Sequence, residues 1–204
     1  MEFLLIIAWL VLCIHYVDTQ AKHSLFYLFT VQSRRSVNNI YESSVVTFLN
    51  DTQIDSYNSW SNVRIPKQTW MKELEERYWE GGTEKLKADI NLTSSFLKIV
   101  MEDFGHNESE LHVLQWRNGC EVEKHSDSAG FISNCFNGHG YDGEDLVSDT
   151  FKPMKWSTSE HEAKKREGRL NVEYYRETVQ KCEECGTWLK IYLHFNTTET
   201  SVGM

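Results

Sequence analysis

Residues 181–193 read KCEECGTWLKIYL, and their apolar and cysteine positions repeat with the period of one face of an α-helix. The side chains at spacings of three and four, which point the same way, are Cys182, Cys185, Trp188, Leu189 and Tyr192. The matching stretch upstream is residues 111–122, LHVLQWRNGCEV, which is rich in strand-forming residues and contains Cys120. A helix stapled by a disulfide to a sheet is therefore the predicted centre of the fold.

The amino-terminal residues predict export. Residues 3–14, FLLIIAWLVLCI, form an apolar run of signal-peptide length, and small residues suited to cleavage precede Lys22. The run is shorter than the roughly 20 apolar residues of a membrane-spanning helix. We therefore expect residues 1–21 to be a cleaved signal peptide, and the mature protein to be secreted and free of any membrane.

Four of the five cysteines remain after that cleavage, and an oxidising compartment predicts two disulfides. Three pairings are possible. We favour Cys120 with Cys185 and Cys135 with Cys182, because two helix cysteines one turn apart can each meet one of two cysteines on neighbouring strands. A redox role for the pair Cys182 and Cys185 is the alternative, but that motif prefers a helix N-terminus and here lies among glutamates within a helix.

Surface chemistry narrows the partners further. Four sequons predict N-glycosylation of a secreted chain, at Asn50, Asn91, Asn107 and Asn196. The formal net charge of −9 argues against nucleic acid or an anionic membrane as a partner.

The order of patterns along the chain repeats once. Strands are predicted at residues 24–30, buried on both faces, then at 40–49 and 53–57, followed by a loop at 59–67. A helical piece at 70–79, a break at Gly81 and Gly82, and a helix capped by Thr83 follow. The predicted inner face of that helix, which ends at Gly105, is Leu86, Ile90, Leu97, Val100 and Phe104.

The second half has strands at 111–122 and 131–141, then short strands at 146–147 and 150–154. A capping box at 157–160 opens a helical run to about residue 193, and residues 194–204 form a polar tail. Strands followed by a helix, twice, predict an α+β fold: one antiparallel sheet of about eight strands, with two long, broken helices on one face and a groove between them.

These motifs, in this order, resemble the α1/α2 platform of major histocompatibility complex class I heavy chains. The resemblance covers residues 22–193, with an α1-like half at 22–108 and an α2-like half at 109–193. The matching pieces are His23-Ser24-Leu25 with Tyr27, Asp51-Thr52-Gln53, Tyr78-Trp79-Glu80, Gly119-Cys120-Glu121-Val122, Tyr141-Asp142-Gly143-Glu144-Asp145, Trp156-Ser157-Thr158, and Cys185 with Trp188-Leu189 and Tyr192-Leu193.

The resemblance implies that Cys120 and Cys185 form the family's α2 disulfide, whereas Cys135 and Cys182 lie outside the common pattern. It also implies that the positions binding a peptide's amino terminus carry Tyr27, Tyr78, Tyr192 and Gln180. The positions for the peptide's carboxylate carry Asp103, Lys164, Glu167 and Gly168. A pair of like charges at about 4 Å costs on the order of 4 kcal/mol, so Asp103 and Glu167 should repel that carboxylate. We expect no bound peptide, and expect the tyrosines to fill a narrowed groove by hydrogen bonding to each other.

The functional expectation is a secreted ligand without the family's α3 domain, similar to stress-induced ligands of a natural killer receptor and to secreted poxviral class I-like proteins. It would act as a decoy in viral immune evasion by binding an immune-cell receptor through the helix tops. The candidate contact residues are Glu84, Lys87, Asn91, Lys98, Lys165, Arg169, Glu173 and Arg176.

Three alternatives remain: capture of a cytokine, a presenting platform paired with β2-microglobulin, and an enzyme. Thr30, Gln115 and Asp145 lie at family light-chain positions, but without α3 we expect an unpaired chain. No hydrolase, phosphate-loop or metal-ligand motif occurs, and His106, His112 and His161 are interpreted as exposed or satisfied. We expect no catalysis, no cofactor and no metal.

Overall fold

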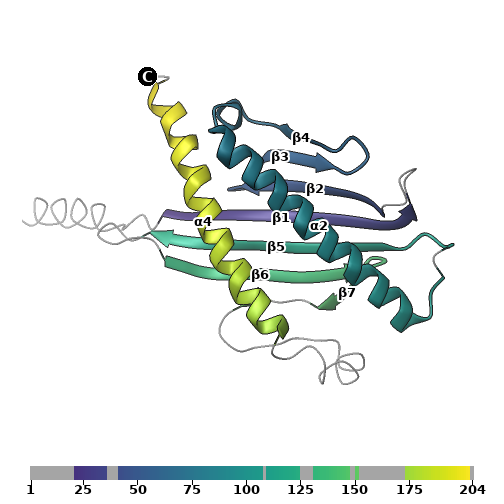
Figure 1. The fold of residues 1–204 in the computed structure, drawn as a ribbon. Helices are drawn as coiled ribbons and strands as arrows, with labels where there is room; N and C mark the ends of the chain where they lie inside the picture. Colours follow the sequence, from purple (N-terminus) through teal and green to yellow (C-terminus); the bar gives the residue numbers. More distant parts are fainter. Residues whose placement is uncertain are drawn as a thin grey trace, which may run out of the picture.

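The computed structural model describes residues 21–35, 41–107, 109–124, 131–147, 150–151 and 173–202. Eight antiparallel strands in these ranges form one sheet, and two long helices cross the same face of it (Figure 1). The strand order is β4-β3-β2-β1-β5-β6-β7, with β8 paired to β6. The strands are β1 (Ala21–Arg35), β2 (Tyr41–Leu49), β3 (Thr52–Asn58), β4 (Val63–Pro66), β5 (Val113–Lys124), β6 (Phe131–Tyr141), β7 (Glu144–Val147) and β8 (Thr150–Phe151). The predicted α+β platform is therefore confirmed.

The first half of the sheet follows the sequence pattern with two corrections. The turn between β2 and β3 is at Asn50 and Asp51, both at positive φ, as a tight hairpin requires. In β1, buried residues alternate with half-buried ones, so this strand is not buried on both faces as predicted. The predicted loop at 59–67 contains β4, an edge strand that ends at Pro66, where a missing N–H is tolerated.

The helix α2 (Glu76–Phe104) follows a short 3₁₀ turn, η1 (Trp70–Lys72). It passes through Gly81 and Gly82 without the predicted break, and the Thr83 hydroxyl donates to the Trp79 carbonyl within the helix instead of capping it. Gly105 ends the helix at a φ of 69°, as expected. Four of the five predicted inner residues are buried, but Phe104 is 39% exposed, because the helix runs past the core at this end.

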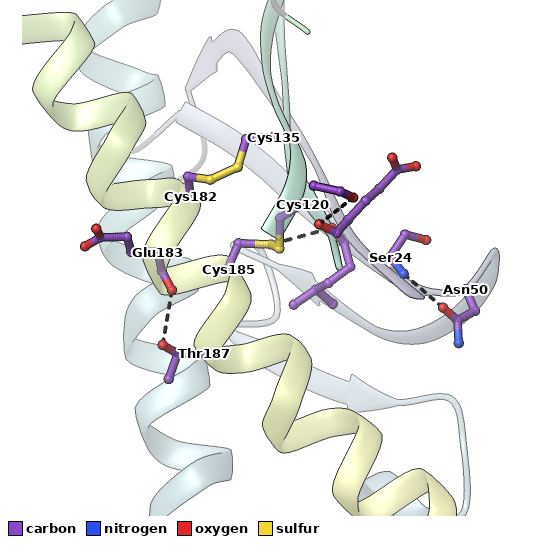
Figure 2. The surroundings of a disulfide bond; sticks show 11 residues. Ser24, Asn50, Cys120, Cys135, Cys182, Glu183, Cys185 and Thr187 are labelled. Atoms are coloured by element: carbon purple, nitrogen blue, oxygen red, sulfur yellow. Dashed lines mark hydrogen bonds between the residues drawn. A yellow bond between two sulfur atoms is a disulfide. The ribbon is translucent and has the colours of Figure 1, made fainter. Parts of the chain in front are cut away.

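The second half places a helix across strands, as predicted. Cys120 on β5 lies opposite Cys135 on β6, and α4 (Glu173–Val202) crosses above them. Disulfides join Cys120 to Cys185 and Cys135 to Cys182, the favoured pairing, with Cα–Cα distances of 5.9 and 5.8 Å (Figure 2). The helix continues to Val202, beyond its predicted end near residue 193 and into the predicted polar tail.

The core lies between the sheet and the two helices. Its larger cluster draws on β1, β5, α2 and α4 together, and includes Leu25, Phe29, Leu86, Trp116 and Leu189. A smaller cluster lies under the carboxyl-terminal half of α2. Within the described ranges, no helix combines the length and apolarity that crossing a bilayer demands.

Candidate functional site between the two helices

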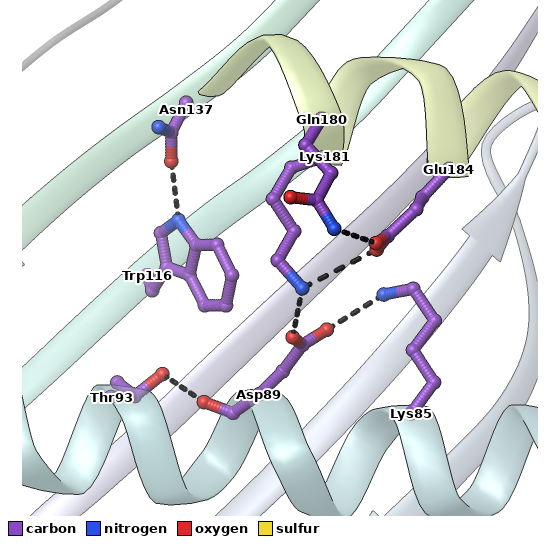
Figure 3. Close-up of polar contacts among 8 residues, drawn as sticks. All are labelled: Lys85, Asp89, Thr93, Trp116, Asn137, Gln180, Lys181 and Glu184. Carbon is purple, nitrogen blue, oxygen red and sulfur yellow. Dashed lines mark hydrogen bonds and ion pairs between the residues drawn. The ribbon is translucent and has the colours of Figure 1, made fainter. Parts of the chain in front are cut away.

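A buried carboxylate bridges the two helices where a groove was predicted (Figure 3). Asp89 on α2 is 1% exposed, and its two oxygens accept from Lys85 and Lys181 at 2.6 Å each. Lys181 lies on α4 and also contacts Glu184 at 3.3 Å. The two lysines and two carboxylates balance in charge, so the bridge brings no net charge into the space between the helices.

The pKa of Lys181 reflects this environment. Burial would lower it, but the hydrogen bond and charge of Asp89, with the charge of Glu184, raise it above its ordinary value. Lys181 therefore stays protonated and holds α4 to α2 throughout the physiological pH range. Lys85 also lies 4.7 Å from the centre of the Tyr27 ring, within reach of a cation–π contact.

A second buried charge, Arg64 on β4, occupies the space nearer the carboxyl-terminal end of α4. Its guanidinium donates to the Asp55 carboxylate at 2.7 Å and to the Tyr192 hydroxyl at 2.9 Å. It also donates to the Trp79 carbonyl and lies 4.4 Å from the centre of that ring. Burial would lower the pKa of Arg64, but Tyr192 and Asp55 raise it, so this buried group remains charged.

Two of the tyrosines predicted for the groove lie in the core, and the third packs at its edge. Tyr27 and Tyr192 are buried, and burial raises the pKa of Tyr192 to about 12. The Tyr192 hydroxyl accepts from Arg64, a residue that the prediction did not include. Tyr78 is half-buried and packs edge-on against Phe195 of α4.

Aromatic side chains fill the floor beneath the other half of α2. Trp116 stacks on Phe29 at 4.8 Å between ring centres and donates to Asn137 at 2.6 Å (Figure 3). His139 lies parallel to Trp116 and meets the Phe96 ring of α2 at 4.8 Å. Burial lowers the pKa of His139 to about 3, so this floor is neutral at physiological pH.

The structure describes only some of the other residues that were predicted to line the groove. Asp103 and Gln180 are exposed, and Gln180 donates to Glu184 at 3.1 Å. Lys164, Glu167 and Gly168 lie outside the described residues, so the predicted repulsion of a carboxylate stays a prediction.

The candidate receptor residues on α2 lie on its outer flank. Glu84 pairs with Lys87 at 3.0 Å, and Lys98 lies above the Tyr41 ring of β2, on the side away from α4. Lys165 and Arg169 lie outside the described residues, and the side chains of Glu173 and Arg176 are likewise not described. Of the sequon residues, Asn50, Asn91 and Asn107 are exposed and Asn196 is half-buried.

Two exposed apolar residues were missing from the sequence prediction. Leu92 and Ile99 are 55% and 53% exposed and lie seven positions apart on α2. Lys85 precedes Leu92 by seven positions, which places all three on the stripe of α2 nearest to α4. Helical spacing could have revealed this stripe once the inner face was known.

The sheet face opposite the helices carries the family's light-chain positions. Thr30 pairs with Gln115, and Asp145 binds Arg117 at 2.8 Å. A cavity of about 260 Å³ is lined by Thr30, Gln32, Glu42, Ser43, Ser44, Asn58 and Trp60.

Comparison with known proteins agrees with this architecture. Residues 21–200 match the model of the family described as class I histocompatibility antigen, domains alpha 1 and 2. The chain belongs to this class I family. It is 28% identical over 183 residues to the H-2 class I histocompatibility antigen Q10 alpha chain of Mus musculus, a match covering 86% of this chain and 54% of that protein.

Two further relatives show similar levels of identity. The Patr class I histocompatibility antigen CH28 alpha chain of Pan troglodytes is 26% identical, over 87% of this chain and 51% of its own length. The major histocompatibility complex class I-related protein 1 of Mus musculus is also 26% identical, over 74% of this chain and 43% of its own length. The chain thus spans about half the length of the curated relatives it matches.

Class I-like proteins are in general extracellular or cell-surface proteins without enzymatic activity. They generally interact with immune receptors, and with peptide or β2-microglobulin. Membership describes the family, and the contacts between α2 and α4 are the features that belong to this chain itself.

Proposed function

We propose that this class I-like chain is a secreted ligand that occupies an immune-cell receptor, of the natural killer activating type, through the outward surfaces of its helices. It carries no peptide and acts as a soluble decoy in immune evasion. No catalytic role is proposed.

The observation that carries the proposal is the bridge between Asp89 and Lys181. A peptide lying between the helices would have to displace this contact and leave Asp89 buried without its partner from α4. Breaking a buried ion pair in this way costs about 3–5 kcal/mol. The Arg64 side chain adds a second obstacle, because it fills the space beside Tyr192 that a peptide's amino terminus would need.

The proposed receptor-binding surface consists of side chains of α2 that are exposed to solvent. Leu92 and Ile99 offer apolar contacts beside the bridge, and Glu84, Lys87 and Lys98 form a charged rim on the outer flank of α2. Interfaces commonly combine a small apolar centre with a polar rim. The apolar run at residues 3–14 supports export through the secretory pathway.

The test begins with residues 1–204, fused to a carboxyl-terminal tag and expressed in mammalian cells. Protein recovered from the medium is cross-linked to leukocytes, and the captured receptor is identified by mass spectrometry. Recovery of a natural killer surface receptor, with neither light chain nor peptide, supports the proposal. Finding the protein only on the producing cells would contradict secretion.

A matched pair of variants then locates the contact. Substituting both Leu92 and Ile99 by serine should weaken receptor binding at least tenfold, because loss of a hot-spot residue costs more than about 1 kcal/mol. Leu111→Ser is the control, since Leu111 is 61% exposed and lies beyond the end of α2. Equal binding by both variants would move the contact away from this stripe.

Other captured proteins would redirect the conclusion. A soluble cytokine in place of a receptor would favour the cytokine-capture alternative. Recovery of β2-microglobulin with eluted peptide or lipid would mean that the bridge between Asp89 and Lys181 opens, and would overturn the proposal.

A further inference from the structure

A cluster of histidines and acidic groups lies at the corner where α2 ends, outside the site described above. His106 follows Gly105, His112 precedes β5, and Asp142 lies in the turn after β6. One potential ligand atom from each of these three residues lies within 4.8 Å of the other two. The connection from α2 to β5 and the turn after β6 therefore converge on one point.

His112 is the best-defined member of the cluster. The residue is 8% exposed, and its Nδ1 lies 2.7 Å from the Asp142 carboxylate, within hydrogen-bond distance. With Nδ1 held by Asp142, the other ring nitrogen, Nε2, lies on the side of Glu110. That Nε2 atom is buried and has no hydrogen-bond partner among the described residues.

A carboxylate that holds one nitrogen of a histidine, while the other nitrogen is left as a ligand, is the usual arrangement at protein metal sites. The Glu110 carboxylate lies 3.6 Å from His112 Nε2, too far for a hydrogen bond. Two ligand atoms at about 2.0–2.2 Å from a zinc ion are separated by a similar distance, so an ion fits between them.

His106 supplies the third group. Its ring stacks on His112 with 4.2 Å between centres and 5° between planes, and its Nδ1 lies 2.6 Å from the Tyr141 hydroxyl. A metal ion lies in the plane of each imidazole that binds it, so two parallel rings cannot share one ion. His106 is half-buried and lies directly after the helix-ending Gly105, and joining a shared ion requires its ring to turn out of the stack.

We propose that this corner binds a divalent transition-metal ion of the zinc type. The ligands are His112 Nε2, the Glu110 carboxylate and a His106 nitrogen that leaves Tyr141 on binding, and Asp142 orients His112. Imidazole with a carboxylate suits zinc, and the exposed side of the cluster leaves a position for water.

The test uses full-length protein carrying a tag without histidines. Titration with zinc chloride in a calorimeter should give saturable binding of one ion per chain, and cobalt(II) should give the visible absorption of a tetrahedral site. Absence of saturable binding by either metal would overturn the proposal.

Two variants and a control assign the residues. Asp142→Asn keeps the turn, since asparagine tolerates the φ of 50° found there. It can donate its amide N–H to Nδ1 and thereby move the proton to Nε2, so zinc affinity should fall about 10–100-fold. His106→Gln should weaken binding by a similar factor, whereas His194→Gln, on the exposed surface of α4, should not change it.

A further measurement uses the unmodified protein, so its result does not depend on whether a variant folds. Zinc should protect the half-buried His106 of the unmodified protein from carbethoxylation by diethyl pyrocarbonate, as read by peptide mass spectrometry. Equal modification with and without zinc, or equal affinity in all three variants, would place bound metal elsewhere and overturn the proposal.

Discussion

Arg64 explains why two glycines occur in the first turns of a long helix. A Cβ atom added at Gly82 would lie 2.6 Å from the Arg64 Nη1 atom, closer than atoms can approach. A Cβ at Gly81 would meet only the Trp188 ring, at 3.9 Å. The Arg64 side chain is 1% exposed and bound to Asp55, so it cannot move aside freely. Gly82 therefore provides room for a buried cation, and the adjacent glycine does not.

This difference predicts opposite effects of two neighbouring substitutions. Gly81→Ala should raise the free energy of unfolding by about 0.5–1 kcal/mol, because alanine is the better helix former. Gly82→Ala should lower it by about 1–3 kcal/mol through overpacking against Arg64. Urea denaturation of both variants measures the difference. An equal gain in the free energy of unfolding of both variants would show that the Arg64 side chain can move aside at little cost.

His139 predicts a loss of stability in mild acid. Burial holds its pKa at about 3 in the folded protein, against about 6.5 in the unfolded chain. Between these values the unfolded state binds the proton and the folded state does not, so stability falls as the pH drops below 6.5. From pH 7.5 to 5.5 this contribution amounts to about 1.4 kcal/mol.

The substitution His139→Phe isolates that contribution. Phenylalanine keeps the aromatic contacts to Trp116 and Phe96 but cannot be protonated. The variant should lose about 1.4 kcal/mol less than the wild type between pH 7.5 and 5.5, as measured by urea denaturation at both pH values. The same pH dependence in both proteins would mean that His139 is protonated without unfolding.

At the scale of elements, two disulfides hold α4 to two different strands one helical turn apart (Figure 2). Their sequence separations, 65 and 47 residues, differ too little to matter: loop entropy distinguishes them by about 0.3 kcal/mol. Burial distinguishes them more. Cys120, Cys135 and Cys185 lie in the core, and Cys182 alone of the four cysteines in these two bonds is only partly buried.

We therefore expect unequal costs when each pair is removed. Replacing Cys120 and Cys185 by alanine should cost about 2–5 kcal/mol and add a cavity in the core. Replacing Cys135 and Cys182 should cost less, by about 1 kcal/mol or more, since fewer core contacts are lost. Guanidinium unfolding of the two double variants gives the comparison, and equal midpoints would contradict it.

Patterns within one element were predicted well from sequence, and contacts among three elements were not. The period of residues 181–193 predicted which face of α4 meets the sheet. The strand signals around Cys120 and Cys135 predicted two neighbouring strands, each joined to α4 by one disulfide. The helix break predicted at Gly81 and Gly82 was wrong because local propensity does not reveal an arginine that is distant in sequence. That arginine belongs to β4, a strand of four residues whose Pro66 favoured the prediction of a loop.

The same limit applies to the site. The spacing of Lys85 and Asp89 is visible as an ion pair on one helix, but the approach of Lys181 depends on how α4 crosses α2. Leu92 and Ile99 could be recognised as exposed only after the inner face of α2 was placed on the sheet. Sequence patterns specify faces, and the crossing of the helices determines which faces meet.

At the scale of the whole molecule, the two similar halves form one structural unit. β1 of the first half pairs with β5 of the second along twelve residues, from Ala21 opposite Lys124 to Gln32 opposite Val113. The larger core cluster combines side chains from both halves. Separating them would expose a long central strand edge and divide this core.

This continuity predicts a single cooperative unfolding transition for the full chain. Tryptophan fluorescence, to which tryptophans of both halves contribute, should change at the same urea concentration as the far-ultraviolet circular dichroism. A fragment of residues 21–108 should lack native near-ultraviolet dichroism, since β1 would lose one neighbour and the core would lose Trp116, Cys120 and Leu189. The control is a mixture of both fragments, in which partial recovery of signal would indicate reassembly through the β1–β5 pairing. Two separate transitions in the intact chain, or a folded isolated half, would instead mean that each half is a domain and that the interface between them is dispensable.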